Sequence, residues 1–502
     1  MTLLVKNVRV LGGEKKFPDA VDVFVSGEKI SAIGNFPGKS ADTVIEGNGA
    51  YLSPGFIDVD TESDHYLSIF TNPGQEDFLK QGVTTIVGGL CGASLAPLIY
   101  GSLESIADWT KVAQVNVDWR SMKEFFDVVG RMSLGINFST FTGHSTIRQA
   151  LIGQKPRNLT KNEILVFSQL LKKSLDEGAM GMSTGLGFAQ NRETAYGELK
   201  ALAAIVAEAG GVYATHLRDE KEDLLGSFDE AVRLAKETKV KFLISHLLPV
   251  QGHEGDYEKA LEQIKNLPAD LDFHFSLYTS TTRILKLYTF LPIWAQKDDL
   301  DVMTLSLEDE WMRQKITKDL PKVDPKKFMV AQAPGNDSLV GASLFDLKQI
   351  FSLKNYEETL IKLMRTTRLR AIVFYENINS ELLRSAIKNP RSIIASNAAS
   401  IKENKQVLTL KPERSVSTFP NLIKMALSEK IIDIEEAIQK ITVLPAKMMG
   451  LEKRGVVAEG NFADLTVFKE TGISHVILNG KTVIKDGEFQ NVLAGKIIKK
   501  IK

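Results

Sequence analysis

A regular alternation of strand-like and helix-like segments over the middle of the chain constrains its fold most. Short apolar runs of strand length recur there, for example at 84–88, 211–215, 241–245 and 392–395. Stretches with helical periodicity lie among them, for example at 163–177, 196–209 and 227–238. Such alternation is typical of a parallel sheet whose strands are connected by helices. The length of the alternating region predicts an α/β fold of the (β/α)8 TIM-like barrel type.

The two ends of the chain look different from the middle. Both are rich in short alternating strands and tight turns, such as the turn at Gly27 and the hairpin signal Asn479-Gly480. Neither end is long enough for a large sheet by itself. We therefore predict one small β-sandwich domain built from residues 1–54 and 449–502. The barrel would span 55–448, with an inserted lid or small subdomain around 298–371.

Composition excludes several classes of function. The 62 basic residues balance 62 acidic residues, which argues against a surface for nucleic acid or for an anionic membrane. The single cysteine excludes an internal disulfide framework and suits a reducing compartment, so we expect a cytoplasmic protein. No secretory signal pattern or long uncharged apolar run is present. We expect a small-molecule substrate, and we expect the lysine-rich segment 496–502 to be a solvated tail.

Chemically interesting residues follow the predicted strands, at the end of a barrel where catalytic groups gather. Apolar runs are followed or ended by four residues of interest: Cys91, His216, His246 and Asn397. After a further apolar run, acidic residues occupy every second position of 58–64. One cysteine and two histidines would suit a zinc ion with one open coordination position. By spacing alone this signal is weak, because a lone buried cysteine is usually a small core residue and a lone histidine at a strand end is more often structural. A core of this size needs no metal to fold, so a metal would serve chemistry.

Several stretches resemble the amidohydrolase superfamily and, within it, the N-acyl-D-amino-acid deacylase (D-aminoacylase) family. The first is 52–58, LSPGFID, which is similar to the opening of the superfamily barrel, and the more specific one is 81–97 around Cys91. Further similar stretches occur in the same order over nearly the whole chain, at 143–148, 177–186, 213–220, 244–246, 278–280, 418–420, 444–446, 453–455 and 460–465.

The resemblance implies an activity and a cofactor. It implies a metal-dependent hydrolase that cleaves the amide bond of N-acyl-D-amino acids or similar compounds. It also implies one tightly held zinc ion, carried by Cys91, His216 and His246. A thiolate and two imidazoles are ligands that Zn²⁺ accepts readily.

The chain departs from the family pattern in three places, and the first two bear on the chemistry. The family has His-x-His after its first barrel strand, where this chain has Asp60 and Glu62. We expect the second metal position to be lost, the alternative being a harder ion bound by carboxylates. The catalytic aspartate of the family matches Asn397, whose neutral amide cannot accept and return a proton. Asp60 or Glu62 would have to replace it as the general base.

The resemblance implies only some of the residues that would contact the substrate. The polar residues that follow the second zinc histidine in the family are Leu247 and Leu248 here. Tyr278 and Arg414 resemble surviving members of the clamp that holds the substrate carboxylate. Further residues expected near the substrate are Arg218 and His144, and a scaffold role is the alternative for His144.

Three functions remain open at this point. The first is hydrolysis of N-acylated amino acids. The second is a catalytically impaired descendant that keeps the fold and binds a ligand or a partner, since fold alone does not decide function. The third is another amidohydrolase reaction, such as the opening of a cyclic amide.

Overall fold

The fold described here is that of a computed structural model. The structure describes residues 1–106, 110, 112, 115–153, 157–296, 299–402 and 409–500. The first residue of the expected insertion, at 298, and the last two residues of the chain lie outside these ranges. The proposed domain boundaries stay a prediction, and the elements are given below as they occur.

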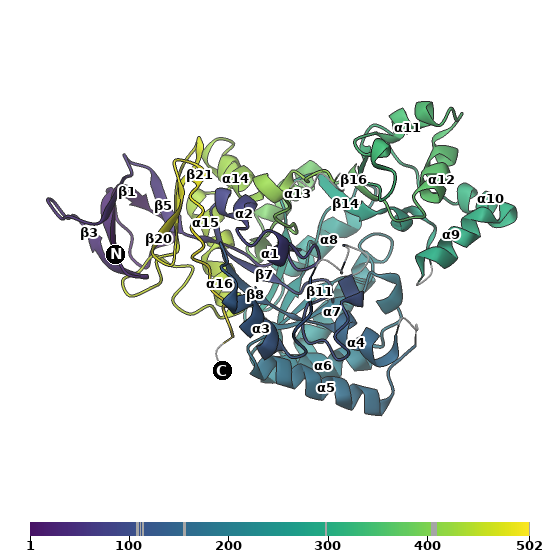
Figure 1. The fold of residues 1–502 in the computed structure, drawn as a ribbon, viewed down its shortest axis with the longest axis horizontal. Coiled ribbons are helices and arrows are strands. Elements are labelled where there is room, and N and C mark those ends of the chain that lie inside the picture. The colour runs from purple at the N-terminus through teal and green to yellow at the C-terminus, as the bar shows by residue number, and fades with distance from the viewer. Residues whose placement is uncertain are drawn as a thin grey trace.

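The middle of the chain forms a parallel barrel (Figure 1). Its strands are, in chain order, β6 (Phe56–Asp58), β7 (Val83–Gly88), β8 (Asn137–Thr140) continued by β9 (Thr142–Gly143), β10 (Gly181–Gly185), β11 (Val212–His216), β12 (Lys241–Ile244), β13 (Phe273–Leu277) and β17 (Ser392–Ile394). All the pairings between neighbouring strands are parallel. The predicted (β/α)8 TIM-like fold is therefore confirmed.

The barrel closes where its first and last strands meet. Thr61 and Ala398 form a parallel bridge just beyond β6 and β17. The amide of Asn397 donates to the carbonyl of Asp60 at 2.8 Å, and the amide of Glu62 donates to the carbonyl of Ala398 at 2.8 Å. Closure thus places the segments after β6 and β17 directly beside each other.

Helices cover the outside of the barrel. They include α2 (Glu76–Lys80), α3 (Met122–Arg131), α4 (His144–Ile152), α5 (Lys161–Asp176), α6 (Tyr196–Glu208), α7 (Leu224–Thr238), α8 (Glu254–Lys265), α13 (Ser380–Ile387), α14 (Arg414–Leu427), α15 (Ile434–Ile441) and α16 (Val443–Met449), with the short α1 (Ser68–Thr71) at the mouth. Their starts are encoded locally. In α5, for example, Thr160 and Glu163 form a reciprocal capping box that satisfies two free backbone N–H groups. Apolar side chains of these helices and of the strands form the largest core of the molecule.

The two ends of the chain form one β structure beside the barrel, where purple and yellow strands lie together in Figure 1. Its strands are β1 (Thr2–Val10), β2 (Val21–Ser26), β3 (Lys29–Gly34), β4 (Thr43–Glu46), β5 (Tyr51–Pro54), β18 (Leu465–Lys469), β19 (Gly472–Leu478), β20 (Lys481–Lys485) and β21 (Glu488–Phe489). Strand β1 pairs with β2 and β4 along its first half and with β5 along its second, and β5 pairs with β18. Side chains from both ends share a core between the two halves, as expected for the small sandwich.

A third unit lies after β13, on the side of the barrel where the strands end (Figure 1). Three antiparallel strands form its sheet in the order β14 (Thr282–Lys286), β16 (Ile372–Glu376) and β15 (Phe328–Gln332). Helices α9 (Leu300–Glu308), α10 (Glu310–Lys318), α11 (Leu344–Ile350) and α12 (Tyr356–Thr366) complete it. It has a hydrophobic core of its own. We call residues 282–376 the inserted unit.

The lysine-rich C-terminal segment is not a solvated tail, and that prediction is wrong for residues 496–500, the part of it that the structure describes. The amide of Phe138 in β8 donates to the carbonyl of Lys496 at 2.9 Å, and the amide of Ile498 donates back to Phe138 at 2.8 Å. The segment therefore adds to the edge of β8. None of the helices in the described part of the chain combines the length and apolar character that crossing a bilayer requires.

Candidate metal centre and active-site cavity

Four polar residues at the carboxyl end of the barrel are held by the turns that follow its strands. Cys91 follows β7, His216 ends β11, His246 follows β12 and Asn397 follows β17. Cys91, His246 and Asn397 have positive φ angles of 50°, 38° and 46°. This left-handed backbone is costly for a residue with a side chain and is often found where a functional group must be aimed.

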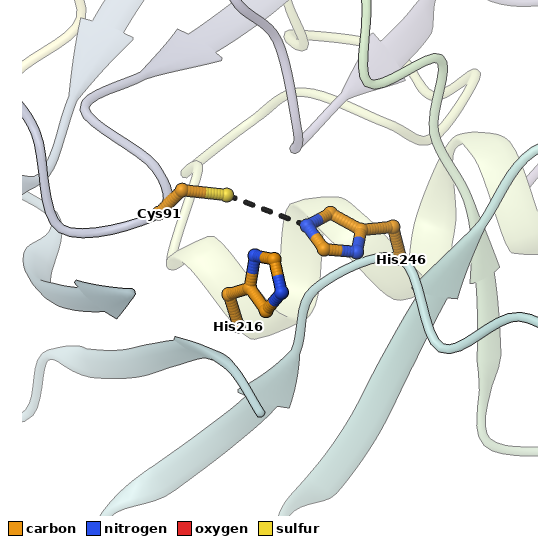
Figure 2. Close-up of side chains that lie close together, drawn as sticks. All are labelled: Cys91, His216 and His246. Atoms are coloured by element: carbon orange, nitrogen blue, oxygen red, sulfur yellow. Dashed lines mark hydrogen bonds between the residues drawn. The ribbon is translucent and has the colours of Figure 1, made fainter. Parts of the chain in front are cut away.

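Cys91, His216 and His246 come together as a group able to hold a metal (Figure 2). One donor atom from each lies within 4.8 Å of the others, and no other such group occurs in the described ranges. Cys91 Sγ lies 3.4 Å from His246 Nε2, and the two imidazole rings meet edge to face at 4.6 Å. His216 Nδ1 is buried and has no hydrogen-bond partner in the structure. One thiol, one imidazole nitrogen facing it and one orphaned imidazole nitrogen fit the donor set of zinc.

A carboxylate that the sequence analysis missed touches both imidazoles. Glu220 Oε1 lies 3.2 Å from His246 Nδ1 and 3.5 Å from His216 Nε2. Its other oxygen, Oε2, accepts a hydrogen bond of 2.6 Å from Arg283 Nη2. The position of Glu220, four residues after His216, was a usable signal. Nothing in the sequence pointed to Arg283, because it lies in β14 of the inserted unit and not at the end of a barrel strand.

The surroundings shift the ionisation of this group. Burial raises the pKa of the Cys91 thiol to about 11, although His246 opposes this. Burial also lowers the pKa of His216 to about 4, although Glu220 opposes this. For His246, burial acts in the same direction but is outweighed by Cys91 and Glu220, which hold its pKa well above the usual value. A bound cation would favour the thiolate, since metals deprotonate the thiols that coordinate them.

Asp60 and Asn397 are hydrogen-bonded to each other where the first and last barrel strands meet. Asn397 Nδ2 donates to Asp60 Oδ1 at 3.3 Å, and Ser276 Oγ donates to Asp60 Oδ2 at 2.9 Å. The hydroxyl of Ser276 in turn accepts from the backbone amide of His246 at 2.8 Å. Asp60 is fully buried, and both of its oxygens are already engaged. It belongs neither to the metal group nor to the described residues that line the cavity.

Glu62 is placed differently from Asp60. It lines the cavity, and its Oε2 is buried without a hydrogen-bond partner. Burial raises its pKa, and the Arg414 guanidinium, 3.9 Å away, opposes the rise. Arg414 lies over the ring of Tyr278 at 4.5 Å, and its own Nε is buried without a partner.

The cavity has a volume of about 750 Å³ and opens between the barrel and the inserted unit. On the barrel side it is lined by Glu62, Cys91, His216, Arg218, Glu220, His246, Tyr278, Asn397 and Arg414. Residues 284–286 and 288–294 form the other wall, which is largely apolar apart from Lys286 and Thr289. The structure therefore brings together most of the residues that the sequence singled out.

Two of the residues expected to contact the substrate, His144 and Arg218, are held by carboxylates of the protein instead. His144 is not among the described residues that line the cavity. It is fully buried, and its Nε2 lies 2.8 Å from Glu198 Oε1, so a scaffold role accounts for it. Arg218 does line the cavity, but its guanidinium is held by Glu230 at 2.9 Å and 3.1 Å. Neither side chain is free to hold a substrate carboxylate in this arrangement.

Comparison with known proteins agrees with the fold and the resemblance. Residues 363–483 match the model of the amidohydrolase family. The chain is 25% identical to a D-aminoacylase of Alcaligenes xylosoxydans xylosoxydans over 514 aligned residues, covering 99% of this chain and 97% of the relative.

Two solved structures are similar over 99% of both chains. A crystal structure of D-aminoacylase superposes with a TM-score of 0.82 at 24% identity. The N-acyl-D-glutamate deacylase of Bordetella bronchiseptica, solved with zinc and a phosphonate inhibitor, gives a TM-score of 0.79 at 20% identity. The resemblance to the amidohydrolase superfamily, and within it to the D-aminoacylases, is confirmed.

Proposed function

Since the chain has the amidohydrolase fold and is similar along its length to D-aminoacylase, we propose that it is a metal-dependent hydrolase of the amide bond in N-acyl-D-amino acids or closely related compounds. The observation that carries this proposal is the cavity. It holds the Cys91, His216 and His246 group together with Glu62, a carboxylate with one oxygen that has no hydrogen-bond partner.

A single metal position is supported. The donor set of Cys91, His216 and His246 suits Zn²⁺, and Zn²⁺ bound there would polarise a carbonyl group and lower the pKa of a water molecule. A second position that uses Asp60 has no support, because Asn397 and Ser276 already occupy both of its oxygens. The direct bond between Asn397 and Asp60 links the ends of the first and last barrel strands without any ion.

Glu62 is the better supported of the two candidate general bases. A base must reach the proton that it removes, and Glu62 lines the cavity whereas Asp60 is not among the described residues that line it. The raised pKa of Glu62 also suits a group that must take up a proton and release it again near neutral pH. In the proposed reaction the oxygen of water attacks the acyl carbon while Glu62 takes a proton from the water. The carbon–nitrogen bond then breaks, and Glu62 gives the proton to the leaving amine.

Arg414 and Tyr278 would orient the substrate. The unpartnered Nε of Arg414 could donate to a carboxylate of the substrate, and the Tyr278 ring fixes the plane of the guanidinium. Arg414 also lies within ion-pair distance of Glu62. A substrate carboxylate bound to Arg414 would therefore lie next to the proposed base.

One observation favours the impaired descendant as a second candidate. Asn397 cannot accept a proton, and its amide is committed to Asp60. If Glu62 does not supply the base, the cavity would still bind an N-acylated ligand without cleaving it.

The test is turnover of N-acetyl-D-amino acids and their L-enantiomers by the zinc-loaded protein, with free amine as the measured product. We expect activity that falls roughly 10²–10⁴-fold in Glu62→Gln, the usual cost of losing a general base. The matched control is Asp60→Asn, with a much smaller expected effect because Asp60 does not line the cavity. Unchanged turnover in Glu62→Gln would rule out Glu62 as the base. Activity that appears only in Asn397→Asp would identify the native protein as the impaired form.

A further inference from the structure

Glu220 contacts the two imidazoles of the metal group from the side away from Cys91. Its Oε1 lies near Nδ1 of His246 and near Nε2 of His216. The nitrogens left over are His246 Nε2, which faces the Cys91 sulfur at 3.4 Å, and the orphaned His216 Nδ1. The same oxygen of Glu220 thus faces Nδ1 on one histidine and Nε2 on the other.

This contact has a chemical consequence. A carboxylate oxygen only accepts, so its closeness to His246 Nδ1 at 3.2 Å and to His216 Nε2 at 3.5 Å favours a proton on each of these two nitrogens. In a neutral imidazole the other nitrogen then carries the lone pair that a metal needs. Glu220 would therefore leave the lone pairs on Nε2 of His246 and on Nδ1 of His216, the two atoms that point into the group with the thiol.

Glu220 needs a counter-charge of its own, because its side chain is only 11% exposed. Arg283 Nη2 donates to Glu220 Oε2 at 2.6 Å and is itself 12% exposed. Arg283 lies in β14, whose pairing with β16 places it opposite Tyr375 in the inserted unit. Burying a carboxylate without such a partner is expensive, so the position of Glu220 depends on a strand that does not belong to the barrel.

We propose that Glu220 is a positioning residue that sets opposite tautomers on His216 and His246, and that Arg283 of the inserted unit holds Glu220 in that position. The inserted unit would then contribute to metal affinity as well as lining the cavity. This inference rests on the proposed function only in requiring that Cys91, His216 and His246 hold the metal.

The experiment measures the affinity of metal-free protein for Zn²⁺ by competition with a chromophoric chelator. We expect Glu220→Gln to weaken Zn²⁺ binding roughly 10–100-fold, as is usual when the partner of a ligating histidine is removed. Arg283→Met should weaken it less, by several-fold. The double variant should bind within about threefold of Glu220→Gln, because Arg283 acts through Glu220.

Glu198 offers a matched control. Its Oε1 contacts His144 Nε2 at 2.8 Å and Arg148 Nε at 3.2 Å, the same combination of carboxylate, imidazole and guanidinium outside the cavity. Glu198→Gln should leave Zn²⁺ affinity unchanged. A loss equal to that of Glu220→Gln would attribute the effect to general loosening of the fold and would overturn the proposal.

A second readout reports the tautomers directly. In zinc-loaded protein labelled with ¹⁵N-histidine, one zinc-bound ring should be coordinated through Nδ1 and the other through Nε2, and this pattern should be lost in Glu220→Gln. The same tautomer on both rings of the native protein would overturn the proposal. If Glu220→Gln does not fold, Arg283→Met carries the affinity test alone, and native affinity in that variant is the contrary result.

The outcomes separate this inference from the proposed function. Wild-type protein that fails to bind Zn²⁺ contradicts the metal site itself and this inference with it. Wild-type protein that binds Zn²⁺ tightly while Glu220→Gln binds equally well contradicts only the role of Glu220.

Discussion

Restoring a carboxylate at position 397 tests how the mouth of the barrel is held together. Asn397 is only 8% exposed, and its Nδ2 lies 3.3 Å from the oxygen of a fully buried carboxylate, Asp60. Asn397→Asp replaces this donor with an oxygen that carries charge. The hydrogen bond becomes a repulsion between two acidic groups that face each other out of water.

The cost can be worked from the distance. Two unit charges 3.3 Å apart repel by about 5 kcal/mol at an effective dielectric constant of 20. The pair can avoid this repulsion by keeping one proton. For a carboxyl of ordinary pKa this costs about 5.6 kcal/mol at pH 8 but only about 1.5 kcal/mol at pH 5. At low pH the pair of the variant keeps a proton and avoids the repulsion, so the variant loses little stability there and more as pH rises.

Urea-induced unfolding at pH 5 and pH 8 measures this effect. We expect Asn397→Asp to lose about 5 kcal/mol of unfolding free energy at pH 8 and much less at pH 5. Asp60→Asn added to Asn397→Asp should recover most of the loss at pH 8, as a strongly coupled pair does. Asn377→Asp is the matched control, because Asn377 also lines the cavity and is also 8% exposed. A loss below about 1 kcal/mol at pH 8, or an equal loss in the control, would refute the reasoning.

Two further predictions concern the pH dependence of stability and the metal. Burial raises the pKa of Asp58 to about 7, despite hydrogen bonds from the amides of Ser396 and Asp60. The folded state therefore holds a proton between about pH 4 and pH 7 that the unfolded state releases, and wild-type stability should fall over this range by up to about 4 kcal/mol relative to Asp58→Asn. Parallel pH profiles of unfolding free energy for the two proteins would contradict this. Zn²⁺ at one hundred times its Kd should stabilise the wild type by about 2.7 kcal/mol in a thermal melt. Cys91→Ala lacks one of the three donors and should gain far less at the same concentration, so an equal gain would argue against the assigned site.

Much of the metal group could be predicted from the sequence because its members are tied to strand ends. Cys91, His216 and His246 each stand where an apolar strand-length run stops, and the carboxyl ends of parallel strands meet at one face of a barrel. The order of strands and helices along the chain is enough to place them near one another. The same logic placed Asn397 at the mouth of the cavity.

Other assignments depended on partners that are distant in the sequence. His144 stands at a strand end as well, but Glu198, which is 54 residues later, holds its imidazole away from the cavity. Arg218 is likewise held by Glu230 from the following helix. Glu220 and Arg283 are 63 residues apart and belong to different units, so no local pattern connects them.

The sequence by itself determined the barrel, the sandwich formed by the two ends and the chemical types at the strand ends. It placed two carboxylates, Asp60 and Glu62, on the same face of the segment after the first barrel strand, where the strand period of two makes them equivalent candidates. Only the tertiary structure separated them. Ser276 and Asn397, 216 and 337 residues away, satisfy both oxygens of Asp60, while Glu62 beside the cavity keeps one oxygen that accepts no hydrogen bond. Which polar group stays available for chemistry is decided by the hydrogen bonds that closure of the barrel brings to it.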